Sequence, residues 1–376
     1  MDFNRYFASR RGEMLNTLKK VVSLESPTSD KKAVDACAAF VVGELRKSGG
    51  RVTRLPQKDI GDLHIVEYGA GGVKAEEGRI LVLTHIDTVW PIGRIGTMPY
   101  YVSGDKVFGP GALDMKAGVV MTLFALATLR QLNVAPKKRI SVFINSAEET
   151  GHDAARAVIK DLARKSSLVL CLEPALPGGA LKLERKGRLV VRLETRGKAA
   201  HAGSPDKGVN AIEELAAQIL RLKKIRTGEI TANVGVCSGG EKANVVPEAA
   251  EAVLDVRFWR SADREKVRTY FRELRPVLKG AKVRAVIECP TPPMEKTRAS
   301  MELFARAGGI AAGLGITLSG GKTGGGSDAS IASSLGVPTL DGLGPDGDGL
   351  HAENEQVLIP SFVERTALLT ELLAKL

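Results

Sequence analysis

The chain has 376 residues, of which 44% are hydrophobic and 26% are charged, so it has the composition of a globular protein and the length of two domains. Its formal net charge is +11, but the basic residues are scattered and aromatics make up only 5%, so no nucleic-acid-binding signature accompanies the charge. No N-terminal apolar run has signal-peptide length, no stretch reads as a membrane span, and no cysteine pair has CxxC spacing. We therefore predict a cytoplasmic protein that binds neither nucleic acid nor a membrane.

The first part of the chain alternates between helical and strand patterns. Several segments carry apolar residues at helical spacing, and several short apolar runs are typical of buried strands, with a glycine-rich turn at residues 69–78. The predicted helices are 7–24, 30–47 and 116–132, and the predicted strands are 63–68, 79–84, 139–145 and 168–172. Such alternation favours a mostly parallel sheet covered by helices on both faces.

The middle of the chain has a different order of elements. In sequence, the predicted elements are a strand at 188–197, a helix at 209–225, strands at 232–237 and 249–259, a helix from Ser261 or Asp263 to Leu278, and a strand at 282–289. This βαββαβ order is that of the ferredoxin-like α+β fold.

The last part returns to the first pattern, with predicted helices at 299–314 and from Pro360 onward and short strands at 316–318 and 337–340. The predicted fold class is therefore α/β: a mostly parallel, helix-covered sheet domain into which a smaller ferredoxin-like domain is inserted. We place the sheet domain, which would bind metal, at residues 1–182 and 298–376, and the inserted domain at residues 183–297.

Candidate metal ligands follow the predicted strands of the sheet domain. They are His85 and Asp87 after strand 79–84, Asp114 before helix 116–132, Glu148 and Glu149 after strand 139–145, Glu173 after strand 168–172, and His351 in a late loop. In open parallel sheets, ligands bind outside the carboxyl ends of the strands, so side chains that are distant in sequence can meet there.

The residue types indicate zinc. Imidazoles mixed with carboxylates suit zinc better than magnesium or calcium, which prefer oxygen ligands alone. We expect two zinc ions, with cobalt or manganese as substitutes, that share Asp114 as a bridge. His85 and Glu173 would complete the shell of one ion, and Glu149 and His351 that of the other.

Two carboxylates remain beside these ligands. If Glu149 binds metal, the adjacent Glu148 can face the water between the ions and act as the general base. Asp87 is placed to accept the free ring N–H of His85, which would fix the tautomer of that ligand. Taken singly, each of these residues also has an ordinary structural explanation, such as a helix cap or a solvated surface.

Several motifs together resemble a known enzyme family. They are THIDTVWPIG, GPGALDMKAG, NSAEETG, LEPA, GKAAHAGSPDKGVNA, NVVPEAAEAVLDVRF, GGGSDAS and GLHAENE. The chain resembles the co-catalytic zinc peptidases that include bacterial glutamate carboxypeptidase, succinyl-diaminopimelate desuccinylase, acetylornithine deacetylase and aminoacylase, and its motifs are most similar to those of glutamate carboxypeptidase. The resemblance implies the same metal ligands and the same roles for Glu148 and Asp87.

The resemblance also implies roles outside the metal ligands. His201 would stabilise the oxyanion, a role that family members often fill from the partner subunit. The inserted domain would be a lid, and the chain would form a homodimer through it. Asn244 and Arg257 would hold the substrate. The loop with Gly325, Gly326 and Ser327 offers backbone N–H groups for a substrate carboxylate.

The chain departs from the family pattern at two places, and the identity of the substrate is left with alternatives. Ala147 stands where many relatives have aspartate, and the segment LKLERKGRL differs from the glutamate carboxypeptidase pattern. We expect a small peptide or acyl-amino-acid substrate with a free carboxylate, cut either by a carboxypeptidase that releases C-terminal glutamate or a similar amino acid, or by an N-acyl-amino-acid deacylase or desuccinylase. A non-catalytic binding protein is the less favoured alternative.

Overall fold

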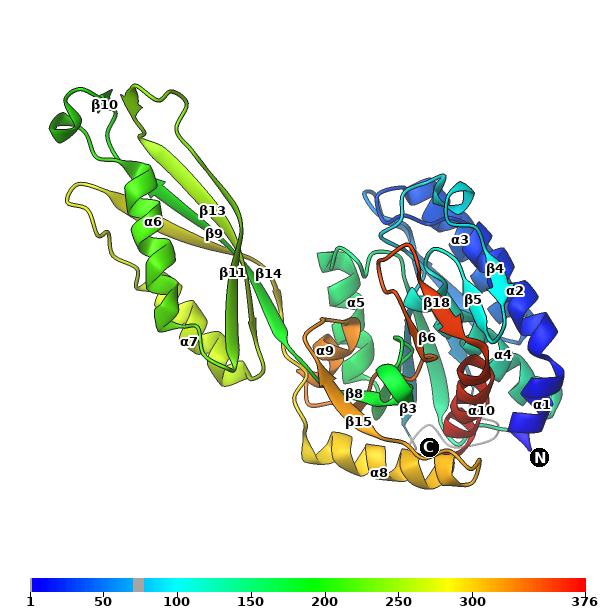
Figure 1. Cartoon of the computed structure of the whole chain (residues 1–376). Coiled ribbons are helices and arrows are strands. Elements are labelled where there is room, and N and C mark those ends of the chain that lie inside the picture. Colours follow the sequence, from blue (N-terminus) through cyan, green and yellow to red (C-terminus); the bar gives the residue numbers. More distant parts are fainter. Residues whose placement is uncertain (1, 70–77) are drawn as a thin grey trace. The chain divides into compact units, whose positions relative to one another are not determined.

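The computed structural model describes residues 2–69 and 78–376, which fall into two compact units (Figure 1). Unit 1 comprises the chain up to Leu183, Lys296–Lys322 and Ser327–Leu376, and unit 2 comprises Glu184–Glu295 and Thr323–Gly326. Each unit has its own hydrophobic core. The turn expected at residues 69–78 lies almost entirely outside the described residues.

A six-stranded sheet forms the centre of unit 1, in the order β1-β2-β6-β3-β7-β16. Its strands are β1 (Arg51–Leu55), β2 (Leu63–Tyr68), β3 (Arg79–His85), β6 (Arg139–Asn145), β7 (Leu168–Cys171) and β16 (Thr339–Leu340). The pairs β6–β3, β3–β7 and β7–β16 are parallel, whereas β1 and β2 add antiparallel pairs at one side. The mostly parallel sheet predicted from the sequence is thus confirmed.

Helices cover both faces of this sheet (Figure 1). Helix α4 packs against α2, α3 and α10 on one face, and α5 packs against α9 on the other. The helices of unit 1 are α1 (Phe3–Ser9), α2 (Arg11–Ser23), α3 (Lys31–Lys47), α4 (Ala117–Gln131), α5 (Asp153–Arg164), α8 (Arg298–Ala312), α9 (Asp328–Ser333) and α10 (Ile359–Lys375), with short turns η2 (Arg94–Gly96), η3 (Ala112–Lys116) and η4 (Pro177–Gly179).

The segment Ala112–Gln131 is by length and composition apolar enough to cross a membrane, but 89% of its apolar 18-residue window is buried inside the fold. A helix that is apolar all round is typical of a buried position in a protein core, which is where α4 lies.

A small antiparallel sheet, β17-β18-β5-β4, adjoins the loops of unit 1 that carry candidate ligands. Its strands are β4 (Tyr101–Ser103), β5 (Lys106–Phe108), β17 (Gly347–Asp348) and β18 (Gln356–Leu358). The loop between β17 and β18 carries His351, and the chain after β5 leads to Asp114. The pairing of β18 with β5 therefore fixes the bases of two ligand-bearing loops side by side.

Unit 2 is a four-stranded antiparallel sheet, β11-β13-β9-β14, with α6 and α7 on one face (Figure 1). Its main elements are β9 (Gly187–Arg196), α6 (Ala211–Arg221), β11 (Ile230–Gly239), β13 (Ala249–Phe258), α7 (Ser261–Arg272) and β14 (Lys282–Thr291). The spatial order 2-3-1-4 of these strands confirms the ferredoxin-like prediction. Shorter elements are β10 (Ala200–His201), η5 (Pro205–Lys207), η6 (Leu222–Lys224) and β12 (Val245–Val246); β8 (Leu181–Arg185) and β15 (Gly320–Thr323) lie where the chain passes between the units.

Three local predictions differ from the structure. The helix expected at 7–24 is broken at Arg10, whose dihedral angles (φ −101°, ψ 8°) leave the helical region between α1 and α2. The residue that caps α7 is Arg260, with no side-chain bond, and the helix ends at Arg272, ahead of Pro276, whose ring and missing N–H do not fit inside a helix. The short strand expected at 316–318 is instead β15, four residues later.

Candidate metal centre

The predicted ligands of unit 1 meet at the carboxyl ends of three neighbouring parallel strands. His85 is the last residue of β3, the pair Glu148 and Glu149 follows β6, and Glu173 follows β7. Asp114 reaches the same edge from η3, just before α4, and its peptide bond to Met115 is cis. The sheet order β6-β3-β7 explains the convergence, because the three strand ends are adjacent.

Asp114 lies between two histidines. Its Oδ1 atom is 3.2 Å from Nε2 of His85, and its Oδ2 atom is 3.3 Å from Nε2 of His351. On its own side, His85 is also 3.6 Å from Oε1 of Glu173, and His351 is 3.5 Å from Oε2 of Glu149. The five side chains thus form two groups that share one carboxylate.

The spacing within these groups fits metal coordination. Ligand atoms at about 2.0–2.1 Å from a tetrahedral zinc ion are separated from one another by about 3.3–3.4 Å. The four distances between histidine nitrogens and carboxylate oxygens run from 3.2 to 3.6 Å, close to that value. The donor set of imidazole and carboxylate is also the set that zinc accepts.

Glu148 lies inside the same cluster. One ligand atom from each of His85, Glu148 and Glu173 lies within 4.8 Å of the other two, and so do atoms of His85, Asp114 and Glu149. Burial raises the pKa of Glu148 well above its ordinary value, and the nearby charge of Glu173 adds to this effect. Glu148 is therefore close enough to act on a molecule bound at this cluster. Its raised pKa means that it binds a proton more readily than an exposed glutamate does.

The negative charges of the carboxylates in the centre are compensated by positively charged groups. Burial opposes the ionisation of Asp114, but hydrogen bonds from His351 and His85 outweigh it and lower the pKa of Asp114. In turn, the bonds to Asp114 and Glu149 raise the pKa of His351 to about 10. Without a metal, protons on the two histidines hold these carboxylates together, and a metal ion would take over that role.

Asp87 fixes the backbone beside the centre. Its fully buried carboxylate accepts the backbone N–H of Glu148 at 3.1 Å and that of Glu149 at 3.2 Å, together with the hydroxyl of Thr28 at 2.7 Å. The ring Nδ1–H of His85 donates to the backbone carbonyl of Asp87 at 3.0 Å, closer than the carboxylate at 3.6 Å. The carbonyl thus sets the tautomer that leaves Nε2 for a metal, and the carboxylate orients the glutamate pair.

The sequence analysis missed a second buried carboxylate, Asp328. Its Oδ2 atom accepts a hydrogen bond from the amide of Asn145 at 2.7 Å, and the carbonyl oxygen of that amide accepts the backbone N–H of Ala147 at 3.0 Å. Burial raises the pKa of Asp328 to about 6. This chain of contacts supports the turn that carries Glu148. The sequence signals that could have identified it are its place in the quoted motif GGGSDAS and its position directly after the glycine-rich loop.

Arg257 and the glycine-rich loop lie together in unit 2. Arg257 donates to both carboxylate oxygens of Asp255, at 2.8 and 3.2 Å, and to the carbonyl of Gly324 at 2.6 Å. The carbonyls of Gly325 and Gly326 both accept from Arg185. Ser327, the first residue back in unit 1, caps α9 and donates to Asp341.

His201 and Asn244 lie at the other end of the sheet in unit 2. The backbone N–H of Ala202 donates to the carbonyl of Asn244 at 3.0 Å, and β10 pairs with β12 there. Strand β13 begins next to this end and reaches Arg257 eight residues after Ala249, which corresponds to roughly 26 Å of extended chain. The structure therefore brings His201 close to Asn244 but separates both from Arg257.

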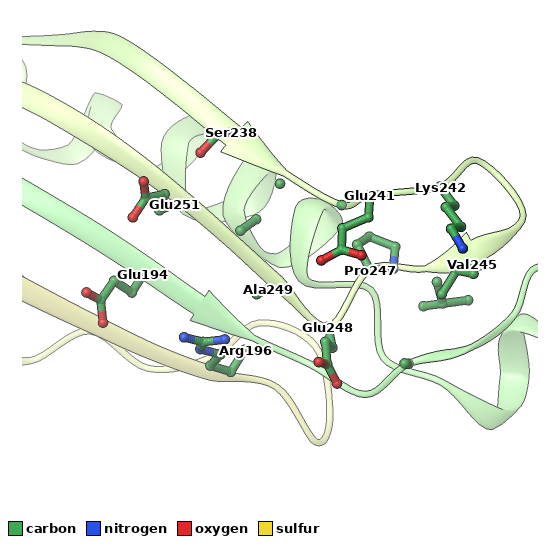
Figure 2. Close-up of a pocket in the computed structure, with 15 residues that line it drawn as sticks. Glu194, Arg196, Ser238, Glu241, Lys242, Val245, Pro247, Glu248, Ala249 and Glu251 are labelled. Atoms are coloured by element: carbon green, nitrogen blue, oxygen red, sulfur yellow. The ribbon is translucent and has the colours of Figure 1, made fainter.

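A hollow of about 660 Å³ also lies at the His201 end of unit 2 (Figure 2). Figure 2 shows Glu194 and Glu251 on adjacent strands, with Glu241 from the turn after β11 and Glu248 just before β13; the basic residues of the hollow are Arg196 and Lys242. The described residues that line it include no histidine or cysteine, so its chemistry differs from that of the metal centre.

The remaining histidines take no part in the described contacts of the centre. His64 is buried in β2, where burial lowers its pKa, and His152 caps α5 through its Nδ1 atom.

Comparison with known proteins places the chain in a family. Residues 81–375 match the model of the peptidase family M20/M25/M40. The chain is 31% identical over 360 residues to carboxypeptidase G2 of Pseudomonas sp. strain RS-16, covering 94% of this chain and 86% of the relative. It is 27% identical over 308 residues to a putative succinyl-diaminopimelate desuccinylase of Mycobacterium tuberculosis, covering 77% and 81%.

The fold is also similar to that of a peptidase of known structure. The crystal structure of aminopeptidase PepT from Bacillus cereus superposes with a TM-score of 0.78 at 22% identity, covering 97% of this chain and 98% of that one. The resemblance inferred from the motifs is thereby confirmed, as is the prediction of a hydrolytic enzyme: the chain belongs to the peptidase family M20/M25/M40.

Proposed function

We propose that the protein is a two-zinc hydrolase that cuts an amide bond beside a free carboxylate, as a carboxypeptidase that releases C-terminal glutamate or a similar amino acid. The observation that carries the proposal is Asp114, which turns one carboxylate oxygen to each of two histidines. The preference for glutamate rests on the motif resemblance, and the 31% identity to a carboxypeptidase supports the reaction class.

On this proposal, five residues hold the metals. His85 and Glu173 would bind one ion, Glu149 and His351 the other, and Asp114 both. Zinc fits the donor set best, and cobalt or manganese would substitute for it. When bound, the metals polarise the scissile carbonyl and lower the pKa of water.

Glu148 acts on the proton. It takes a proton from the attacking water and returns it to the leaving nitrogen, so that the amine departs neutral. Its raised pKa suits the first of these transfers, because a carboxylate with a higher pKa is a stronger base towards the water. Asp87 keeps Glu148 and Glu149 in their separate orientations through their backbone N–H groups.

Arg257 would bind the substrate carboxylate, together with backbone N–H groups around Gly325, Gly326 and Ser327. A guanidinium group can bind a carboxylate through two parallel bonds, as Arg257 does with Asp255 in this structure. The substrate would be a small peptide or acyl-amino acid, since this group of residues recognises one free carboxylate.

His201 and Asn244 would come from a second copy of the chain. They lie too far along the sheet of unit 2 from Arg257 for one small substrate to touch all three within one copy. We therefore propose a homodimer formed through unit 2, in which His201 of one copy stabilises the oxyanion at the centre of the other. Unit 1 would be the catalytic domain and unit 2 a lid, with the enzyme located in the cytoplasm.

An N-acyl-amino-acid deacylase or desuccinylase is the second candidate. Its reaction uses the same ligands and base, and the 27% identity to a putative desuccinylase favours keeping it. The two candidates differ in the group on the acyl side of the amide. A non-catalytic binding protein has less support, because such a protein has no need for Glu148 beside a complete ligand set.

A hydrolysis screen tests the proposed function. Zinc-loaded protein should hydrolyse peptides or acyl-amino acids that end in glutamate faster than acetyl-ornithine, succinyl-diaminopimelate or dipeptides without an acidic residue. Faster turnover of succinyl-diaminopimelate would favour the second candidate. Absence of metal-dependent hydrolysis across the whole set would refute both.

The substitution Glu148→Gln separates a base from a ligand. As a base, Glu148 contributes on the order of 10²- to 10⁴-fold to the rate, so kcat should fall by at least that much. Zinc content, measured by mass spectrometry of the native protein, should stay at two ions per chain. Loss of one ion would show instead that Glu148 is a ligand, as its distance to His85 and Glu173 also allows.

Zinc affinity should rise with pH. Because Asp114 and Glu149 raise the pKa of His351 to about 10, the metal-free ring is protonated at neutral pH and must lose that proton to bind zinc. Chelator competition between pH 6 and 8 should give affinities that rise at least about tenfold per unit, one proton released per site. An affinity independent of pH would contradict this account, and His351→Asn should reduce the slope.

A mixing experiment tests the source of His201. The variants His201→Ala and Glu148→Gln should each be inactive as homodimers. If His201 acts across the dimer, random mixing should restore about a quarter of the active sites, since half the dimers are mixed and each has one complete site. No recovery after subunit exchange, checked by native mass spectrometry, would place His201 in the same copy as its metal centre.

A further inference from the structure

The side chain of Glu355 is buried at the end of the loop that carries His351. Its carboxylate is fully shielded from solvent, although it belongs to a sequence, HAENE, that reads as an exposed acidic turn. Burying a carboxylate is unfavourable unless it is well hydrogen-bonded, so its partners reveal what its position stabilises.

Four N–H groups surround this carboxylate. Oε1 accepts from the backbone of Leu113 at 2.8 Å and of Asp114 at 3.1 Å. Oε2 accepts from the backbone of Gly111 at 2.8 Å and from the indole Nε1 of Trp90 at 2.9 Å. An ionised carboxylate offers about four lone-pair sites, so this set of donors uses all of them.

These bonds join three separate loops at one point. Trp90 lies on the loop after β3, which also carries Asp87, and Gly111 to Asp114 form the turn before α4. The third loop is Glu355's own, between β17 and β18. Each loop carries a residue of the metal centre, and the partners are more than 240 positions from Glu355 along the chain.

The loop of His351 depends on its closing residues. His351 has a φ of 57°, in the left-handed region that non-glycine residues rarely occupy without support from their surroundings. Backbone bonds from Ala352 to Gly349 and from Glu355 to Ala352 form two successive turns around it. Glu355 ends this pair of turns and ties it to the turn of Asp114, so it fixes the bridging carboxylate relative to one of its histidines.

We propose that Glu355 is a positioning residue that holds Asp114 and His351 in the geometry needed to bind the two metals. Glu355 would act through Asp114, without touching substrate or metal. Its carboxylate accepts the backbone N–H of Asp114, which leaves both carboxylate oxygens of Asp114 facing the histidines. Its role is to prepare the centre before the metal arrives. Because this role depends on the proposed metal centre, wild-type metal binding must be measured first.

The substitution Glu355→Gln tests the proposal, with Glu353→Gln as the matched control. Glutamine places an NH₂ group against backbone N–H donors that the carboxylate accepted. Substitution of a residue that orients metal ligands typically lowers metal affinity by about 10- to 100-fold, so zinc binding measured by chelator competition should weaken by that factor. Glu353 lies two residues away on the same loop, is itself exposed and bonds Arg94 at 2.6 Å, so its substitution should leave affinity unchanged.

Thermal unfolding of the metal-free variants distinguishes positioning from a general contribution to stability. A positioning role predicts that added zinc raises Tm less for Glu355→Gln than for the wild type, whatever the Tm without metal. If that variant does not fold, Glu355→Asp, which keeps the charge on a shorter side chain, should fold and bind zinc more weakly than the wild type.

The outcomes have distinct meanings. Wild-type zinc affinity in a folded Glu355→Gln or Glu355→Asp variant would overturn the positioning role and leave the metal centre intact. An equal loss in Glu353→Gln would overturn it too, since the effect would then belong to the loop in general. Absence of zinc binding by the wild-type protein would instead overturn the metal centre proposed above.

Discussion

The structure depends on one electrostatic constraint, the gathering of carboxylates at one edge of a buried parallel sheet. Asp114, Glu148, Glu149 and Glu173 converge there, and Asp328 lies close enough for its charge to interact with that of Glu173. Ionised carboxylates at such separations repel strongly where water is excluded, so protons, imidazolium rings or metal ions must compensate them. The raised pKa of Glu148, caused by burial and then by the charge of Glu173, and that of His351, caused by its bonds to Asp114 and Glu149, agree with this need.

The chain holds these ligands mainly through backbone N–H groups. The carboxylate of Asp87 accepts hydrogen bonds from the backbone N–H groups of Glu148 and Glu149. The carboxylate of Glu355 accepts them from Gly111, Leu113 and Asp114. A backbone donor fixes a ligand's position without occupying its side-chain oxygens or adding a competing charged side chain. The side-chain oxygens of these residues therefore stay available for a metal, although Nζ of Lys182 lies 3.9 Å from Oε2 of Glu173 and adds one positive charge beside the centre.

The parts predicted from the sequence are those with local signals. Buried parallel strands appear as apolar runs, and the residues after them fall at the strand ends, which is why His85 and Glu173 could be named in advance. The strands of the small sheet have two or three residues, too few for any periodicity. Glu355 and Asp328 lie within the quoted motifs GLHAENE and GGGSDAS, but nothing near them in the sequence predicts their burial, because their environment comes from partners 241 and 183 positions away.

The pairing of Arg257 bears on our proposal that this residue binds the substrate carboxylate. Asp255 already occupies Arg257 through two bonds, so an incoming carboxylate has to displace it. Asp255 has a second partner, however: the Nε of Arg188 donates to it at 2.7 Å. Burial opposes the charge of Asp255, and the two arginines together lower its pKa. If Arg257 turns to a substrate, Arg188 still compensates Asp255, so the exchange leaves no half-buried carboxylate unpaired.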